Sequence, residues 1–292
     1  MIYNYFFKCY FKKNYVYKVC YFILKMVFSI FAYIILGIIQ GITEWLPISS
    51  SAMTTLVLSN FFGITSLDFL IKTSLFLHLG TFLAAIIYLR KDVLQLFKTL
   101  FNYRKSDEHD RKLFNFILTS TLISGFIGII IIKLLLNFES FVNLTGKTIS
   151  LIIGILLLIT GFLQLSSRKK GNRKILNLNS KDNILLGIAQ GFSSLPGLSR
   201  SGITVSTLML RKIENSSALK LSFLMSLPIV LAGNILLNIG DTVISANAFY
   251  GLIASFIFGL LTISGLVKIS KKINFGWFVL IFAVLMIISI FI

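Results

Sequence analysis

Long apolar segments recur along this chain and constrain its fold more than any other feature. Only 13% of the 292 residues are charged, against about 25% in a typical soluble domain. The mean hydropathy is +0.90. A helix needs roughly 20 residues to cross the hydrocarbon core of a bilayer. The sequence therefore predicts an all-α integral membrane protein with six transmembrane helices, near 69–89, 113–136, 149–166, 221–240, 249–267 and 275–292.

Two further apolar regions, 28–62 and 184–210, are each interrupted by proline and a serine cluster. Pro47 is followed closely by three serines, and Pro196 is followed by Ser-Arg-Ser-Gly from Ser199. Proline has no N–H to donate and breaks a helix. Broken helices occur at membrane depth where they face protein or water. We therefore interpret both regions as re-entrant helical hairpins and expect a functional site at their breaks.

The basic residues fall in short segments between the apolar regions. Nineteen of the 28 Lys and Arg lie in 90–112, 167–182, 211–220 and 268–272, whereas the alternate segments hold only Lys147. Because basic residues accumulate on the cytoplasmic side, this pattern fixes one orientation and predicts a multi-pass protein of the cell membrane. The formal net charge of +18 is thus a topology signal, and we expect no nucleic-acid partner, which would need a basic face on a folded surface.

The two broken regions resemble each other at an offset of 150 residues. Leu36–Gly41 reads LGIIQG and Leu186–Gly191 reads LGIAQG, and Thr54 corresponds to Thr204. The charge pattern makes the two hairpins enter the membrane from opposite sides. Together these features predict an inverted-topology repeat, whose binding site typically lies between its halves. We expect a single membrane domain over 26–292, with a first repeat at about 28–136 and a second at about 184–267.

Residues 1–25 do not fit this organisation. They carry five lysines among many Tyr and Phe, and the orientation above would place them outside. We interpret them as a leader that is not part of the fold, with Met26 as an alternative start. The other interpretation is a basic, aromatic helix lying at the membrane interface.

Few ionisable side chains remain at membrane depth. Glu44 and Arg200 lie one in each break, and a charge inside the membrane indicates function by default. Gln40 and Glu44, four residues apart, share a helix face. Arg200 offers a planar set of donors that matches phosphate oxygens, and hydroxyls with free N–H groups at a helix start also suit an anion.

These residues predict a membrane-embedded anion pocket in which Glu44 serves proton transfer or metal binding. The alternative is a purely structural bridge between Glu44 and Arg200. His78 lies inside the first span, where a lone histidine is interpreted as a packed, hydrogen-bonded group.

Two stretches, QGITEWLPISSS from Gln40 and PGLSRSGIT from Pro196, closely resemble the signature motifs of the undecaprenyl-diphosphatase family, also called the bacitracin-resistance proteins. The resemblance covers about 26–292. It implies an integral membrane phosphatase that converts undecaprenyl diphosphate to the monophosphate and so recycles the lipid carrier for cell-envelope synthesis. A divalent cation, Mg²⁺ or Ca²⁺, would assist.

The resemblance also implies roles for individual residues. Glu44 would be the second carboxylate of the acidic motif and one candidate metal ligand, Ser50 the nucleophile or a phosphate ligand, and Arg200 the residue that binds the diphosphate. A water activated by Glu44 is the alternative nucleophile. We also expect substrate binding by the other polar residues of the two breaks and their repeats, namely Gln40, Ser49, Ser51, Gln190, Ser199, Ser201 and Thr204.

The chain departs from the family pattern at two places. Gln40 stands where the family usually has Glu, and Ala52-Met53 stands where it has Gly-His. The family's histidine is a proposed acid or base, and Met53 cannot replace it. His78 is an alternative, but the sequence does not place it beside Ser50.

Two other functions remain open at this level. A polyprenyl-phosphate carrier without hydrolytic activity would also use an inverted repeat with broken helices, and a structural membrane subunit would need neither Glu44 nor Arg200 for a lipid reaction. The expected partners are the lipid bilayer and a polyprenyl diphosphate. A homodimer is one assembly that the sequence allows.

Overall fold

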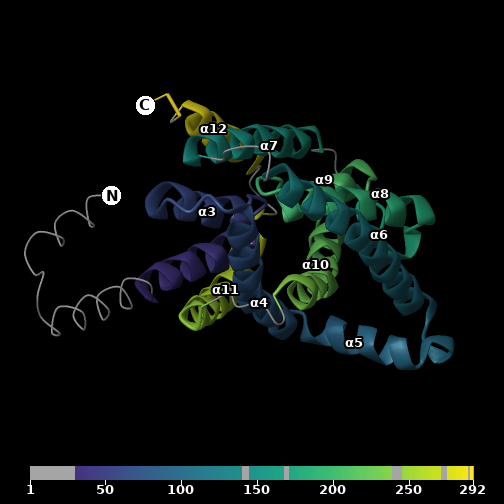
Figure 1. Ribbon diagram of the computed structural model, residues 1–292. Helices are drawn as coiled ribbons and strands as arrows, with labels where there is room; N and C mark the ends of the chain where they lie inside the picture. The colour runs from purple at the N-terminus through teal and green to yellow at the C-terminus, as the bar shows by residue number, and fades with distance from the viewer. Residues whose placement is uncertain are drawn as a thin grey trace, which may run out of the picture.

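The computed structural model describes residues 30–139, 145–167, 171–238, 245–270, 275–288 and 290–291. Within these ranges the regular structure is helical, apart from one isolated bridge between Arg173 and Ile213. The expected leader, 1–25, lies outside the described residues. Figure 1 shows long helices arranged in pairs, with a helix that projects to one side at the end of the bundle.

Five helices are long and apolar enough to cross a membrane. They are α4 (Leu67–Tyr88), α6 (Glu108–Glu139), α7 (Gly146–Ser166), α10 (Asn215–Leu237) and α11 (Ala248–Ser270). The last expected span forms α12 (Phe275–Ile288), which is apolar but has only 14 residues. The prediction of a helical, multi-pass membrane protein is confirmed.

Both interrupted regions form two helices joined by a turn. The first consists of a helix at Ile30–Thr43, then α3 (Ser50–Leu56) and a π-helical turn at Val57–Phe61. The second consists of α8 (Ser180–Phe192) and α9 (Arg200–Leu210). Ser49 Oγ accepts a hydrogen bond from Ala52 N at 3.2 Å, and Ser199 Oγ accepts one from Gly202 N at 3.1 Å. Each serine thus satisfies an N–H that has no partner within its own helix.

The glycines of the two LGIxQG strings allow close packing between helices. A Cβ at Gly41 would lie 2.8 Å from Gly259 N on α11, and a Cβ at Gly191 would lie 2.6 Å from Ile127 Cβ on α6. Small residues let helix backbones approach one another in this way. The first hairpin therefore packs against a helix late in the chain, and the second against a helix early in the chain. Figure 1 shows α7 beside α12 and α6 beside α8, and both pairs are in contact.

The segments that join these helices meet at two places. Three of the four basic segments are linked by direct contacts, among them Lys220–Asp92 at 2.6 Å and Lys112 Nζ to Leu176 O at 2.8 Å. Lys147, the one basic residue of the alternate segments, instead contacts the end of the last expected span, where its Nζ donates to Ile290 O at 2.9 Å. Three of the four basic segments therefore lie close together, as expected if they share one side of the membrane.

A buried carboxylate holds the second hairpin together at its base. Arg173 Nη2 and Arg211 Nε each lie 2.7 Å from an oxygen of Asp182, whose side chain is fully buried. Burial raises the pKa of Asp182, but the hydrogen bonds from Arg173 and Arg211 outweigh burial, so the pKa lies below its ordinary value. The network joins the start of α8 to the end of α9.

The basic segment 90–112 contains an unexpected amphipathic helix, α5 (Arg90–Phe101). Asp92 pairs with Lys220, and Gln95 donates to Asp110. Val93 and Leu96 pack against the core, whereas the other apolar side chains of α5 face outward, and Phe101 is 80% exposed. A helix with this arrangement suits the membrane interface.

Candidate functional site

The turns at the two breaks lie against each other. Ser201 Oγ, in the first turn of α9, donates to Leu46 O at 3.1 Å. Gln164 Nε2, on α7, donates to the carbonyl of Pro47. These contacts bring the start of α9 to the turn that precedes α3, so two segments from different halves of the chain form one polar centre.

Glu44 and Arg200 form an ion pair across the two breaks. Arg200 Nη2 donates to Glu44 Oε1, and Nη1 donates to Ser222 O on α10 at 3.3 Å. Only 5% of the Glu44 side chain and 14% of the Arg200 side chain are exposed. A buried charge is costly unless an opposite charge compensates it. The guanidinium carries five N–H groups, so it keeps donors for a bound anion.

The second oxygen of Glu44 is surrounded by polar groups. Gln40 Nε2 donates to it at 2.9 Å and Ser50 Oγ donates to it at 2.7 Å. His78 Nε2 lies 3.2 Å from the same oxygen and 3.4 Å from Ser50 Oγ. A hydroxyl, an imidazole and a carboxylate thus converge, which is the arrangement that nucleophilic catalysis requires.

His78 is the site residue that the sequence analysis did not predict. Its Nδ1–H donates to Ser74 O at 2.7 Å, one turn earlier on α4. Thr54 Oγ1, on α3, donates to Ser74 Oγ at 3.3 Å. Ser74 and His78, which are four positions apart, share the side of α4 that faces α3. The spacing of these two polar residues was the signal in the sequence that could have pointed to His78.

The remaining hydroxyls of the two breaks support the helix starts. Ser49 Oγ lies 3.2 Å from Ser51 Oγ, and Ser199 Oγ lies 3.5 Å from Ser201 Oγ. Thr204 Oγ1 donates to Arg200 O at 2.8 Å. All five residues lie within about one helical turn of Ser50 or Arg200.

Gln190 lies apart from this centre. It is 2% exposed, and its Nε2 donates to Ser124 Oγ on α6 at 3.0 Å. Its buried Oε1 has no hydrogen-bond partner among the described residues. The repeat therefore places its two glutamines in different surroundings, and only Gln40 binds Glu44.

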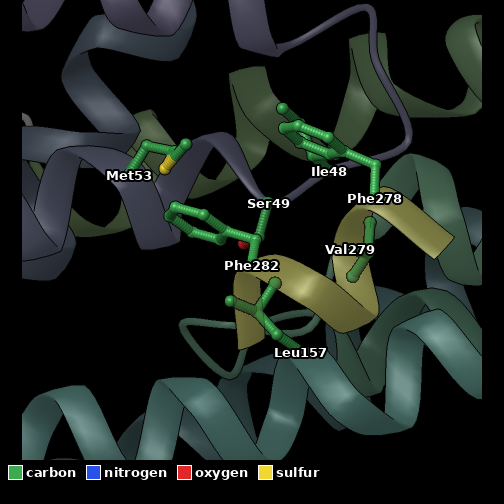
Figure 2. Close-up of a pocket in the computed structure, with 7 residues that line it drawn as sticks. All are labelled: Ile48, Ser49, Met53, Leu157, Phe278, Val279 and Phe282. Carbon is green, nitrogen blue, oxygen red and sulfur yellow. The ribbon is translucent and has the colours of Figure 1, made fainter. Parts of the chain in front are cut away.

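Met53 faces an apolar region. Figure 2 shows its side chain near Phe282 of α12, with Leu157 of α7 also lining the gap. Beside it lies a larger cavity of about 440 Å³. The walls of this cavity come from the Ile30–Thr43 helix, α3, the π-helical turn, α7 and α12. They are mostly apolar, with Ile38, Ile42, Met53, Leu56, Val57 and Phe282 among them, and also include the polar Thr43, Asn60 and Ser150.

The centre offers few ligands to a divalent cation. Glu44 is the one carboxylate there among the described residues, and both of its oxygens already accept hydrogen bonds. The buried Oε1 of Gln40 adds one neutral oxygen. Mg²⁺ prefers six oxygen ligands and Ca²⁺ takes six to eight. A single carboxylate paired with arginine does not fit a cation held by these side chains alone.

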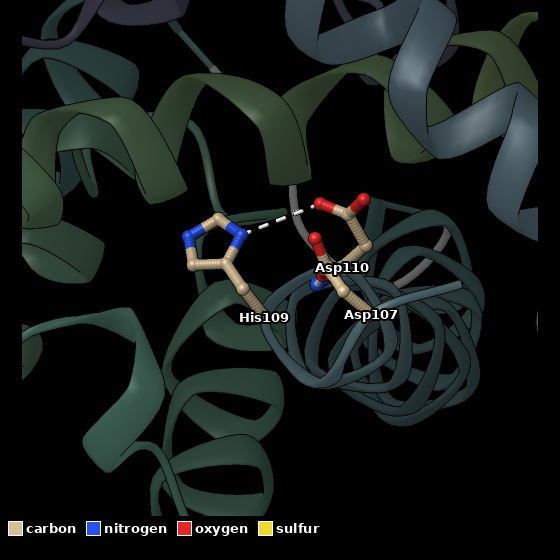
Figure 3. A group of neighbouring side chains, drawn as sticks. All are labelled: Asp107, His109 and Asp110. Carbon is tan, nitrogen blue, oxygen red and sulfur yellow. Dashed lines mark hydrogen bonds and ion pairs between the residues drawn. The ribbon is translucent and has the colours of Figure 1, made fainter.

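Another cluster, Asp107, His109 and Asp110, lies at the start of α6 (Figure 3). Its ligand atoms lie within 4.8 Å of one another. Asp107 Oδ1 accepts a hydrogen bond from Asp110 N at 2.8 Å, and Asp110 also accepts one from Gln95. These contacts cap α6 and join it to α5, so the carboxylates have structural partners.

The fold and the site define a polytopic membrane protein with a buried centre for an anion, formed where two broken helices meet. The chain matches the family described as "Bacitracin resistance protein BacA" over residues 33–288. It belongs to this family.

Relatives that carry a functional name agree with this assignment. An undecaprenyl-diphosphatase of Methanococcoides burtonii is 42% identical over 264 residues, which are 88% of this chain and 97% of that protein. One of Methanothrix thermoacetophila is 36% identical over 84% of this chain and 91% of its own length. The bacterial "Undecaprenyl-diphosphatase 2" of Halalkalibacterium halodurans is 35% identical over 86% and 92%.

Proposed function

We propose that this chain hydrolyses undecaprenyl diphosphate to the monophosphate and phosphate, at the centre formed by Glu44, Ser50 and Arg200. The observation that carries this function is the buried arginine of one break, paired with a carboxylate that also binds the serine of the other break. The relatives are named for this activity. The reaction would recycle the lipid carrier used in cell-envelope synthesis, in the plasma membrane.

The diphosphate binds where Glu44 now contacts Arg200. A phosphate group presents oxygens that fit the guanidinium in two parallel hydrogen bonds. The starts of α3 and α9 add N–H groups and the hydroxyls of Ser51 and Ser201, and a helix N-terminus favours negative charge. Arg200 therefore exchanges its carboxylate partner for the substrate and stabilises the charge that develops during the reaction.

Ser50 is the nucleophile of this proposal. Its Oγ donates to Glu44 at 2.7 Å, and this bond holds the hydroxyl at the polar end of α3, next to the expected position of the terminal phosphorus. A water held by Glu44 is the alternative nucleophile. The two differ in whether a phosphoserine forms at Ser50.

The isoprenoid tail occupies the 440 Å³ cavity between the arms of the first hairpin. Ile42, Leu56 and Phe282 are among the side chains that line it, and burial of apolar surface needs no specific direction. Met53 lies at the end of the cavity nearest Ser49. The tail and the diphosphate would thus bind on adjacent sides of the same hairpin.

A divalent cation takes part as the companion of the diphosphate. Mg²⁺ usually keeps several waters and binds substrate phosphates with few protein ligands. This arrangement agrees with a centre that has one carboxylate. A cation would thus be held mainly by the substrate phosphates and would offset part of their charge.

The finer topology is also a proposal: six spans and two re-entrant hairpins, in two halves of opposite orientation, with the basic segments in the cytoplasm. Matching contacts in the two halves support it. Thr54 binds Ser74 after the first break at 3.3 Å, and Thr204 lies 2.7 Å from Ser222 after the second. Each hairpin also packs against a helix of the other half.

The test is phosphate release from farnesyl diphosphate and Mg²⁺ by the purified protein. We expect turnover that Arg200→Ala abolishes. A carrier would show no turnover but would move polyprenyl phosphate across vesicles in a way that depends on Arg200, and that result would overturn the phosphatase proposal.

A further inference from the structure

His78 combines two contacts that make it suitable for moving a proton. Its Nδ1–H is committed to Ser74 O at 2.7 Å. In a neutral imidazole one nitrogen carries the proton and the other carries a lone pair, so the lone pair lies on Nε2. That nitrogen is 3.4 Å from Ser50 Oγ. The backbone of α4 thereby fixes the tautomer that a base for Ser50 needs.

Glu44 is placed to assist rather than to replace this histidine. Both of its oxygens already accept hydrogen bonds, from Arg200 on one side and from Gln40 and Ser50 on the other. A carboxylate held by the Arg200 guanidinium is a weaker base than a neutral imidazole. In this proposal the Ser50 O–H therefore turns from Glu44 Oε2 to His78 Nε2 before it gives up its proton. Glu44 Oε2, 3.2 Å from Nε2, can then stabilise the imidazolium.

The charged side chains described on the helices that pack against α4 do not offer another base for Ser50. Glu44 and Arg200 are the charged side chains near its ring, and α3 has no ionisable side chain. On the other packed helices, Lys220 of α10 pairs with Asp92 of α5, and Lys268 lies in the last turn of α11. On α4 itself, Lys72 pairs with Asp68.

From this geometry we propose that His78 is the general base of the reaction and takes the proton of Ser50. The inference rests on the proposed phosphatase function. Ser50 Oγ attacks the terminal phosphorus as its proton passes to Nε2, and the bridging P–O bond breaks with its electron pair on the polyprenyl monophosphate. Water then attacks the phosphoserine. One water proton passes to Ser50 Oγ as the Oγ–P bond breaks, phosphate departs, and the proton on His78 goes to solvent.

The role also accounts for the departure at Met53. That side chain lies among apolar residues and has no proton to exchange (Figure 2). The imidazole that acts on Ser50 comes instead from the neighbouring span, α4.

The experiment measures phosphate release from farnesyl diphosphate between pH 5 and 9 for wild type, His78→Ala, His78→Gln and His109→Gln. The exposed His109 is the matched control, because the chain has two histidines. We expect both His78 variants to lose at least about 100-fold in kcat, since a general base typically contributes a factor of 10²–10⁴. Added imidazole should restore part of the activity of His78→Ala.

A binding measurement separates catalysis from folding. The His78 variants should bind a farnesyl methylenediphosphonate, in which carbon replaces the bridging oxygen, within about threefold of the wild-type affinity. Retention of kcat within threefold in both variants, or a loss of kcat that imidazole does not restore in a variant that still binds the analogue, overturns the role of His78. A wild-type protein that releases no phosphate would instead contradict the proposed function itself.

Discussion

Arg200 and Glu44 are 156 positions apart in the chain, yet the guanidinium of one donates to the carboxylate of the other. Each residue lies at the break of a different hairpin, and both side chains are largely buried. The pair thus joins the two halves at the point where the substrate is proposed to bind. In the proposed reaction, a diphosphate would compete with Glu44 for Arg200.

The first prediction concerns the geometry of this pair. Arg200→Lys keeps the charge but loses the planar set of donors, so kcat/KM should fall by about 100-fold. Arg200→Gln leaves Glu44 without its partner and should cost about 3–5 kcal/mol of stability. The double variant Arg200→Gln with Glu44→Gln should recover much of that stability, measured by unfolding in detergent, without recovering activity. Equal stability of wild type, Arg200→Gln, Glu44→Gln and the double variant would contradict a coupled pair.

The second prediction separates the three serines of the first break. Ser50→Ala should lower phosphate release by roughly a thousand-fold or more, as expected for loss of a nucleophile. Ser49→Ala should instead lower stability by about 1 kcal/mol, because Ser49 caps α3. Mass spectrometry of rapidly quenched wild type should detect phosphate on Ser50. Near-normal turnover by Ser50→Ala would mean that water attacks directly.

The third prediction concerns the base of the second hairpin. Asp182→Asn removes a fully buried charge that holds two arginines and should cost about 3–5 kcal/mol at pH 7. Because the folded pKa is lowered, the contribution of Asp182 is complete above the ordinary aspartate pKa of about 3.9 and is lost as pH falls through the folded value. The difference between wild type and variant should therefore shrink only in strong acid.

The control for Asp182 is Asp68→Asn, which removes a partly exposed pair with Lys72 on α4. That change should alter stability by less than about 1 kcal/mol. Equal effects of the two substitutions on thermal unfolding would show that Asp182 does not hold the hairpin.

The fourth prediction tests the apolar cavity as the site of the tail. Val57→Trp adds a large side chain to its wall, so kcat/KM for undecaprenyl diphosphate should fall at least about tenfold while that for a short-chain diphosphate changes little. Leu122→Trp, on a side chain of α6 that is 65% exposed, serves as the control. A loss that is equal for long and short substrates would place the tail elsewhere.

The breaks were predictable from the sequence because their cause is local. Pro47 and Pro196 lie in the turns between the two helices of each hairpin, and Ser49 and Ser199 satisfy N–H groups of the helix that follows. A contact between Glu44 and Arg200 was named only as the alternative to an anion pocket, on the ground that a buried charge needs an opposite one. The breaks themselves could be predicted from neighbouring residues alone.

His78 and Gln190 show where this reasoning ends. The distance from His78 to Ser50 depends on how α4 packs against α3, and no periodicity within one helix specifies that packing. Gln190 was expected at the centre because it repeats Gln40, but it faces α6 and binds Ser124. A repeated motif conserves local structure, whereas the surroundings of each copy depend on which helix packs against it.

The most direct test of the account is kcat for phosphate release from undecaprenyl diphosphate by Glu44→Gln, compared with Glu108→Gln as a surface control. Glu108 is exposed and pairs only with Lys112 among the described residues. We predict a loss of at least about 100-fold for Glu44→Gln, in a protein that stays folded, and wild-type activity for Glu108→Gln. Activity of Glu44→Gln equal to that of wild type would contradict the role of the centre at the two breaks.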